Sequence, residues 1–475
     1  MGKINTNLPY DEKDKYSIWE YSKRLLNKTL NEAVGGIPAE YNSGKGRLGQ
    51  MVEKYFFGYE PNSDPSPDFS EADLELKCTP LKQLANRTLQ IKERLVCSMI
   101  DFNEDYKHSF KESHVFIKCA YMLILMYLHQ ANVPVQHLKF IYSILWQIPE
   151  KDLLIMEQDY NKITAKIRSG KAHELSEGDT TYLGACRKGQ KGDSDQFYTL
   201  PSGELSEIPA PRRAFSLKPQ YMRMVLDFIQ KSGNNSGMNT AALVEGYTPG
   251  LVTKEELKQQ SFEDILIGRF SKYIGMSYSE LCTEFGIDES SAKSKYALIA
   301  NAILTMQGSR GEDVTKSEEF RKSGIRLKTI RLQKSGRPKE AMSFANINYS
   351  EIIHEEDWYD SKLYELFTSR FLFIVFKDYG DKAEEDYRLE KVFFWTMPYQ
   401  DLNEAELYWE NIKDNVLNNH ISPEYFYKES DHKKFHVRPK AKNAADLAIN
   451  PNGGMCKKYC YWFNHDYIQD FIKKN

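Results

Sequence analysis

The sequence predicts an α/β protein of two tandem domains, each built from a mixed sheet flanked by helices. Three observations lead to this fold class. Amphipathic helical segments and short apolar strand-like runs alternate along the first half of the chain. The chain has 475 residues, more than one ordinary hydrophobic core accommodates. Segments of the second half also repeat, in the same order, segments of the first half.

The first elements of the chain are two predicted helices and a strand. Residues 11–33 place apolar side chains on one helical stripe, and residues 45–57 do the same until Gly58 ends the helix. Residues 74–79 alternate apolar and polar side chains, which is typical of a strand. Two more strand-like runs and a long helix follow at 89–100, 114–126 and 150–168.

Residues 231–250 are the clearest linker candidate, because they are rich in Gly, Asn and Ser and contain a Thr-Pro-Gly turn. They divide the chain into nearly equal halves. We therefore predict domains at residues 1–232 and 250–475, joined by a linker at 233–249.

Composition bounds the function. The net charge of the chain is −3, so the average charge does not predict a polyanion partner. Any basic surface must therefore be local. The seven Cys have no regular spacing and no signal peptide is apparent, which indicates free thiols in a reducing cytoplasm. The longest apolar run, 120–128, is too short to span a membrane. Since no Walker-type glycine-rich loop is present, a nucleotide cofactor is not expected.

The most informative segment is the predicted strand with the loop before it. Glu75 and Lys77 are two residues apart, so they share one face of the strand. Asp68 lies seven residues before Glu75, directly after Pro67, which disfavours helix upstream. Two carboxylates and an ammonium at one point can hold a hard divalent cation and activate water against a phosphodiester. The alternative is a charged strand face with a surface Glu–Lys pair.

A second copy of this segment lacks the catalytic pattern. Residues 317–328 match 66–77 with a constant offset of 251, both from 68 to 319 and from 77 to 328. In this copy Glu319 replaces the Asp and Arg326 replaces the central Glu, while Ile303 aligns with Glu53. An Arg repels a cation, so the pattern predicts a catalytic first half and an inactive second half. The alternative is chance similarity between short amphipathic stretches.

Several segments together resemble a known family. They are Gly44–Glu53, Pro67–Lys77, Gly170–Gly178, Arg213–Lys218 and His436–Lys440. With them the chain is similar to the MutH-like branch of the PD-(D/E)XK nucleases, in particular to type II restriction endonucleases of the staphylococcal Sau type, which cut at GATC. The resemblance covers most of the chain.

The resemblance implies a PD-(D/E)XK restriction-endonuclease-like fold and Mg2+-dependent cleavage of double-stranded DNA at GATC. By position Asp68 and Glu75 are the implied metal ligands, and Glu53 is a supporting helix carboxylate. Lys77 either activates the attacking water or stays protonated and stabilises charge. Residues 1–232 would cut, and residues 250–475 would bind a second site as an allosteric effector. With one intact site per chain, two chains are expected to assemble on DNA.

Basic residues in several loops are candidate DNA contacts. They are Lys45, Arg47, Arg187, Lys188, Lys191, Arg213, Lys218, Arg438 and Lys440. A second basic run, from Arg321 to Lys339, contains no acidic residue and suggests a local polyanion surface. For all of these the alternative is an ordinary solvated face.

Two other functions remain open from the sequence. A MutH-like mismatch-repair nickase shares the chemistry but needs one domain. A non-catalytic DNA-binding protein is disfavoured by the complete pattern in the first half.

Overall fold

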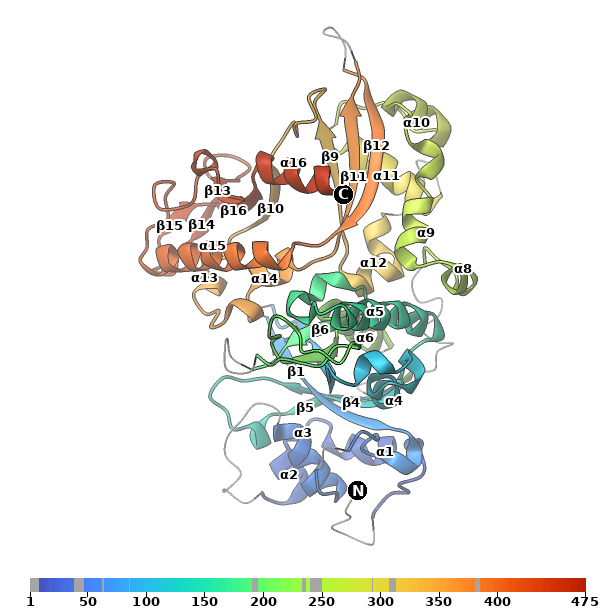
Figure 1. The fold of residues 1–475 in the computed structure, drawn as a ribbon. Coiled ribbons are helices and arrows are strands. Elements are labelled where there is room, and N and C mark those ends of the chain that lie inside the picture. Colours follow the sequence, from blue (N-terminus) through green and yellow to red (C-terminus); the bar gives the residue numbers. More distant parts are fainter. Residues whose placement is uncertain are drawn as a thin grey trace. The chain divides into compact units, whose positions relative to one another are not determined.

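The computed structural model describes residues 8–37, 47–61, 64–84, 86–189, 195–232, 236–239, 250–292, 294–306, 313–380 and 385–475. The chain forms two compact units (Figure 1). The first unit comprises residues 1–175, 179–261 and 317–324; the second comprises 176–178, 262–316 and 325–475. None of the helices in the described ranges is long and apolar enough to cross a membrane.

The first unit contains a five-stranded mixed sheet in the order β2-β1-β4-β5-β8 and a three-stranded antiparallel sheet in the order β3-β7-β6. β1 runs parallel to β4, and β4 runs antiparallel to β5. The strands are β1 Glu75–Gln83, β2 Leu89–Ile91, β3 Leu95–Met99, β4 Tyr121–Leu128, β5 Phe140–Gln147, β6 Leu183–Arg187, β7 Arg213–Leu217 and β8 Ser236–Asn239. The helices are α1 Lys15–Ser22, α2 Leu30–Val34, α3 Arg47–Met51, the π-helix η3 Val52–Phe57, α4 His114–Cys119, α5 Glu150–Arg168, α6 Pro219–Ser232, α8 Lys254–Gln259 and α12 Glu318–Ser323.

The second unit repeats this plan with two three-stranded sheets, in the orders β12-β11-β9 and β10-β16-β13, and a two-stranded β14-β15 ribbon. The strands are β9 Arg326–Leu332, β10 Met342–Asn346, β11 Phe371–Asp378, β12 Tyr387–Trp395, β13 Phe435–Pro439, β14 Leu447–Ile449, β15 Met455–Lys457 and β16 Tyr459–Phe463. The helices are α9 Phe262–Gly268, α10 Tyr278–Phe285, α11 Lys295–Thr305, α13 Tyr349–Ile352, α14 Lys362–Phe367, α15 Tyr399–Leu417 and α16 His465–Lys474.

The duplication is visible in matching registers. Glu75 of β1 lies opposite Met122 of β4, and Arg326 of β9 lies opposite Phe371 of β11, both in parallel pairs. α5 and α15 each span 19 residues and each follow a proline. Asp73 and Gly324, separated by the offset of 251, both adopt left-handed backbone with φ of 48° and 68°. The predicted fold class, two tandem mixed-sheet domains, is confirmed.

Each unit has its own hydrophobic core. The core of the first unit includes Leu74, Leu76 and Leu123, all at most 5% exposed. The second core is rich in aromatic residues, among them Phe373 and Phe463. Burying one such side chain contributes about 1.5–3 kcal/mol, so the strands that carry the charged residues are held firmly.

The single helix predicted at residues 11–33 is wrong. α1 ends at Ser22, and α2 begins only after Thr29. Asn27 adopts a positive φ of 61°, which interrupts the helical path. Thr29 and Glu32 then form a capping box that starts a new helix. The apolar stripe continues across this break, so periodicity alone does not reveal it.

The remaining expectations are confirmed in part. The strand predicted at 114–126 is wrong in its first half, because Ser113 caps α4 by accepting from the Phe116 N–H group. The helix at 150–168 and the end of the second helix at Gly58, with φ of 82°, are confirmed. The described part of the helix that ends at Gly58 widens into a π-helix from Val52, a feature frequent at functional sites.

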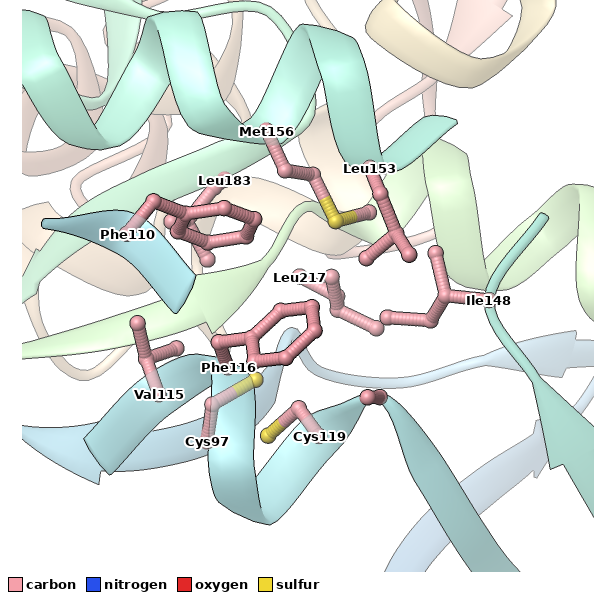
Figure 2. Close-up of a pocket in the computed structure, with 11 residues that line it drawn as sticks. Cys97, Phe110, Val115, Phe116, Cys119, Ile148, Leu153, Met156, Leu183 and Leu217 are labelled. Carbon is pink, nitrogen blue, oxygen red and sulfur yellow. The ribbon is translucent and has the colours of Figure 1, made fainter. Parts of the chain in front are cut away.

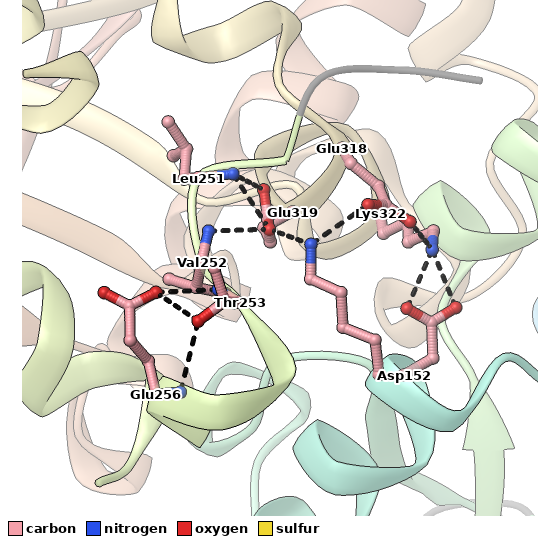
Figure 3. Close-up of polar contacts among 9 residues, drawn as sticks. Asp152, Leu251, Val252, Thr253, Glu256, Glu318, Glu319 and Lys322 are labelled. Carbon is pink, nitrogen blue, oxygen red and sulfur yellow. Dashed lines mark hydrogen bonds and ion pairs between the residues drawn. The ribbon is translucent and has the colours of Figure 1, made fainter. Parts of the chain in front are cut away.

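Helix α12 belongs to the first unit although it lies in the second half of the sequence. Lys322 donates to both carboxylate oxygens of Asp152 at 2.7 Å (Figure 3). Lys151 donates to Glu318 at 3.1 Å and to Glu319 at 2.6 Å. All of these side chains are buried. The first compact unit therefore contains residues from both halves of the sequence.

Candidate active site

Strand β1 places Glu75 and Lys77 on the same side of the first unit's main sheet. Leu74 and Leu76, on either side of Glu75, lie in the hydrophobic core. The side chains of Glu75 and Lys77 are only 3% and 16% exposed. The alternative of an ordinary surface Glu–Lys pair is therefore wrong.

The loop before β1 brings Asp68 to Glu75. The Leu76 N–H group donates to Asp68 Oδ2 at 2.9 Å, and the Asp68 N–H group donates to Glu75 Oε2 at 3.2 Å. Phe69 and Leu74 close the loop with two backbone hydrogen bonds, at 2.9 and 3.2 Å. The seven-residue spacing thus corresponds to a tight turn that returns Asp68 to the first residues of the strand.

Two ammonium groups face Glu75. Lys77 Nζ donates to Glu75 Oε1 at 2.7 Å and to the Cys97 carbonyl at 3.0 Å. Lys118 Nζ lies 3.7 Å from the same Glu75 oxygen. Lys118 is not among the site residues predicted from the sequence, since it lies on α4, within a run that resembles a strand. No local pattern marks it, because only the path from α4 into β4 brings it beside β1.

Glu53 completes the acidic group from the π-helix. Burial, then the charges of Asp68 and Glu75, raises the pKa of Glu53 to about 7. Burial, then the charge of Glu75, raises the pKa of Asp68 to about 6. Without a cation, Glu53 therefore takes up a proton near neutral pH, and Asp68 does so only at about pH 6 and below.

Lys77 stays protonated in this environment. Burial lowers its pKa, but the Glu75 carboxylate outweighs burial and raises the pKa of Lys77 above its ordinary value. The metal-free site therefore favours the role of charge stabiliser over that of general base for Lys77.

The donor set fits a hard divalent cation. Within the residues that the structure describes, no three His, Cys, Asp or Glu side chains lie close enough together to hold a metal by themselves. Mg2+ is commonly held by one or two carboxylates, with water and substrate phosphate as the other ligands. Burial first, and then repulsion between the carboxylates, raises the pKa values of Glu53 and Asp68, and a cation would relieve this repulsion. Asp68 and Glu75 would hold it.

A small apolar pocket is lined in part by residues of α4 (Figure 2). It is lined by Cys97, Phe110, Val115, Phe116, Cys119, Ala120, Ile148, Leu153, Met156, Leu183 and Leu217. Because this lining carries no charged side chain, it suits packing and not phosphate binding. Cys97 and Cys119 connect it to the active site, since the Cys97 carbonyl binds Lys77 and Cys119 follows Lys118. The packing of α4 thus positions Lys118, and β3 holds Lys77 through the Cys97 carbonyl.

The basic residues of the first unit are found in different environments. Arg47 is exposed at the start of α3, whereas Lys45 and Lys191 lie outside the described residues. Arg187 Nη2 lies 3.7 Å from Asp195, and the Lys188 N–H group donates to the Arg212 carbonyl. Their contact with DNA stays a prediction.

Arg213 and Lys218 are buried, at 4% and 6% exposure. Arg213 donates to the Ala185 carbonyl at 2.8 Å, and Lys218 donates to the Thr180 carbonyl. These bonds hold β7 against β6 and the preceding loop. In this state neither residue presents an accessible cation, and a role in DNA binding stays a prediction that requires rearrangement.

The basic residues of the second half differ in the same way. Arg438 is exposed and lies 3.2 Å from Glu429, and Lys440 donates to Phe344 and Ser343. In the run from Arg321 to Lys339, the interpretation as one polyanion surface is wrong. Lys322 is fully buried, and four others of the run form ion pairs or hydrogen bonds with acidic or backbone groups: Arg321, Lys328, Arg331 and Lys339.

Fold and site together define a class of protein. A mixed sheet with Glu75 and Lys77 at the start of one strand, and Asp68 in the loop before it, is the arrangement of a PD-(D/E)XK nuclease. The family model for the DNA mismatch repair enzyme MutH matches the chain twice, at residues 57–159 and 312–406.

The relatives narrow this class. The type II restriction enzyme Sau3AI of Staphylococcus aureus is 31% identical over 95% of both chains. The DNA mismatch repair protein MutH of Shewanella amazonensis is 26% identical over 36% of this chain and 76% of its own length. MutH of Shewanella woodyi is 26% identical over 46% of this chain and 93% of its own length. The chain therefore belongs to the family of MutH-like type II restriction endonucleases, hydrolases that act on double-stranded DNA.

Replacing Lys118 with alanine is expected to slow DNA cleavage by roughly 10- to 100-fold, because a cation beside Glu75 and the substrate phosphate is lost. Cleavage of a fluorescent duplex under single-turnover conditions measures the effect. Lys111→Ala, an exposed lysine in the preceding turn, is the matched control and should leave the rate unchanged. Equal rates for both variants would exclude Lys118 from the site.

The carboxyl pKa values predict a pH-dependent response to divalent cations. Burial and mutual repulsion raise the pKa values of Glu53 and Asp68. These two groups therefore stabilise the metal-free fold fully only when the pH is below the ordinary pKa of a carboxyl group. This contribution is lost as the pH rises through about 6 and about 7. A divalent cation binds the ionised forms. We expect Mg2+ to raise Tm by roughly 3 °C at about pH 8 and by much less at about pH 5.5.

Thermal unfolding with Mg2+ and with EDTA at both pH values measures this response. Glu53→Gln should weaken the dependence above about pH 6, because the group with the higher pKa is gone. An equal Mg2+ effect at both pH values would contradict the assignment.

Proposed function

We propose that the first unit hydrolyses phosphodiester bonds of double-stranded DNA at GATC sites with Mg2+ as cofactor. The observation that carries this proposal is the buried convergence of Asp68, Glu75 and Lys77 at the start of β1. Membership of the restriction-endonuclease family supports the reaction. The GATC sequence is supported only by the resemblance to enzymes of the Sau type.

The chain's own residues divide the work. When bound, the metal supplies charge neutralisation at the phosphate and lowers the pKa of a bound water. Asp68 and Glu75 would hold it with hard carboxylate oxygens. Lys77 keeps its proton and stabilises negative charge, fixed by Glu75 and the Cys97 carbonyl. Glu53, with a pKa of about 7 before metal binds, is suited to accept a proton near neutral pH.

The second unit is proposed to bind a second copy of the site as an allosteric effector. Its counterpart of Glu75 is Arg326, and its counterpart of Glu53 is the fully buried Ile303. A site with these residues does not hold a divalent cation. Each chain then has one cutting centre, and a double-strand break needs two chains or two successive nicks.

Digestion of a sequenced plasmid tests the activity. With Mg2+ we expect discrete fragments whose ends lie at GATC, and with EDTA we expect intact plasmid. Fragment ends at another sequence would refute the specificity, and no cleavage in any divalent metal would refute the activity. Nicks confined to the unmethylated strand of hemimethylated DNA would favour a MutH-like nickase, which the duplicated second unit disfavours.

Analytical ultracentrifugation with a specific duplex in Ca2+ tests assembly. We expect complexes with two chains, because each chain carries one complete acidic group. One chain per duplex would refute assembly on DNA.

A further inference from the structure

The second unit keeps the lysine of the active site but not the metal-binding acids around it. Lys328 Nζ donates to the Ser343 carbonyl of β10 at 3.3 Å, as Lys77 Nζ donates to the Cys97 carbonyl of β3 at 3.0 Å. The two lysines thus occupy equivalent places. Lys77 lies on β1 and binds β3, and Lys328 lies on β9 and binds β10.

The acidic groups around that lysine are replaced or directed elsewhere. Arg326, in place of Glu75, shares a strand face with Lys328 and its Nε donates to Ser369 Oγ at 2.9 Å. Glu319, in place of Asp68, accepts from the Leu251 N–H group at 2.8 Å and from Lys151 at 2.6 Å. The equivalent place is therefore positively charged.

A third cation joins the pair from β13. Lys440, directly after that strand, donates to the Phe344 carbonyl at 2.9 Å and to Ser343 Oγ at 3.2 Å. Lys328 and Lys440 thus meet at Ser343. Burial, then the charge of Arg326, then that of Lys440, lowers the pKa of Lys328 to about 8. Three cations kept this close together are stabilised when an anion binds between them.

The position of Lys440 also repeats a position of the first unit. The Lys440 N–H group donates to the Lys458 carbonyl at 2.9 Å, and the Lys188 N–H group donates to the Arg212 carbonyl at 2.8 Å. Both lysines directly follow the third strand of their three-stranded sheets, β13 and β6. A cation at this place therefore belongs to the repeated plan and is not a chance surface lysine.

We propose that Arg326, Lys328 and Lys440 form a metal-independent binding site for one backbone phosphate of DNA. The guanidinium and the ammonium groups take the place of the divalent cation that the first unit needs at the equivalent point. Arg326 suits this role, because its planar donors match phosphate oxygens. The inference rests on the proposed function for DNA as the source of the phosphate, but it does not depend on cleavage.

The test measures DNA binding by the full chain in EDTA, where cleavage is absent. The probe is a fluorescent duplex with one GATC site, followed by anisotropy at several salt concentrations, with sedimentation for stoichiometry. We expect two binding events for the wild-type chain, one for each unit. Arg326→Ala and Lys328→Ala should each weaken one binding event by roughly fivefold or more and reduce its salt slope by about 0.9.

Lys474→Ala, which removes an exposed cation from α16 of the same unit, is the matched control and should change neither quantity. A duplex without GATC should lose the same factor in the Arg326 and Lys328 variants, since a phosphate contact carries no sequence information. Thermal unfolding confirms that the variants are folded, and Arg326→Gln is a milder second variant.

Unchanged affinity and salt slope in folded Arg326→Ala and Lys328→Ala would overturn the inference. So would a binding event that is weakened by Arg326→Ala but appears only when Mg2+ is added. A chain that binds DNA as expected but never cuts plasmid would refute the proposed catalysis and leave this site standing.

Discussion

Glu75→Gln is expected to reduce DNA cleavage by about 1,000-fold or more while the chain remains able to bind DNA. Glutamine keeps the size of the side chain but removes the charge that faces Asp68, Lys77 and Lys118. A neutral amide is a poor ligand for a hard divalent cation, and Lys77 loses its carboxylate partner. Single-turnover cleavage in Mg2+ measures the loss, and anisotropy in EDTA measures the binding.

The matched control is Glu71→Gln, an exposed carboxylate four residues upstream that lies 3.6 Å from Lys13. It should cut like the wild type, because its surface ion pair contributes little. Activity of Glu75→Gln within tenfold of the control would show that the catalytic centre lies elsewhere.

Lys322→Met is expected to lower the free energy of unfolding of the first unit by about 3–5 kcal/mol. Lys322 is fully buried, and its ammonium lies between Asp152 and Glu318 (Figure 3). Removing it leaves the buried Asp152 carboxylate without its cation and leaves Glu318 with Lys151 alone. Burial already raises the pKa of Asp152 even though Lys322 is present, so this carboxyl would take up a proton.

Urea unfolding, followed by circular dichroism, measures the change. The double variant Asp152→Asn, Lys322→Met should be more stable than Lys322→Met alone, because fewer buried charges are left unpaired. Lys254→Met, which removes a partly exposed pair with Glu150, is the surface control and should cost under about 1 kcal/mol. Equal losses for Lys322→Met and Lys254→Met would show that the buried cluster contributes no special stability.

The same buried ion pairs determine which fragment of the chain contains the complete first unit. A fragment of residues 1–232 lacks α12 and the segment 250–253, and so removes every partner of Lys151 and Asp152 that α12 supplies. We expect this fragment to be less stable than the complete first unit, which includes residues 317–324.

Some of the fold was accessible from local patterns. The alternation at 74–79 predicted β1, the spacing at 150–168 predicted α5, and Gly58 marked a helix end. Patterns failed where a short polar turn decided the path. Where one long helix was predicted, the Thr29 capping box starts a separate helix. Where the first half of a strand was predicted, the Ser113 cap starts α4.

The candidate site divides in the same way. Asp68, Glu75 and Lys77 lie within ten residues, so strand period and one turn were sufficient to predict that they meet. Lys118 lies 43 residues from Glu75, and no pattern near it announces an active-site lysine. Arg213 and Lys218 appear in the sequence as cations available to DNA, yet the fold buries both against carbonyl groups.

The sequence by itself determined the acidic group of β1 and the duplication, because both follow from spacing along the chain. Only the tertiary structure decided which charges surround that group and where α12 belongs. Lys322 and Asp152 are 170 residues apart, and their pairing depends on how helices pack. The physical reason is range: backbone periodicity acts over a few residues, whereas burial and ion pairing act between any residues that the fold brings together.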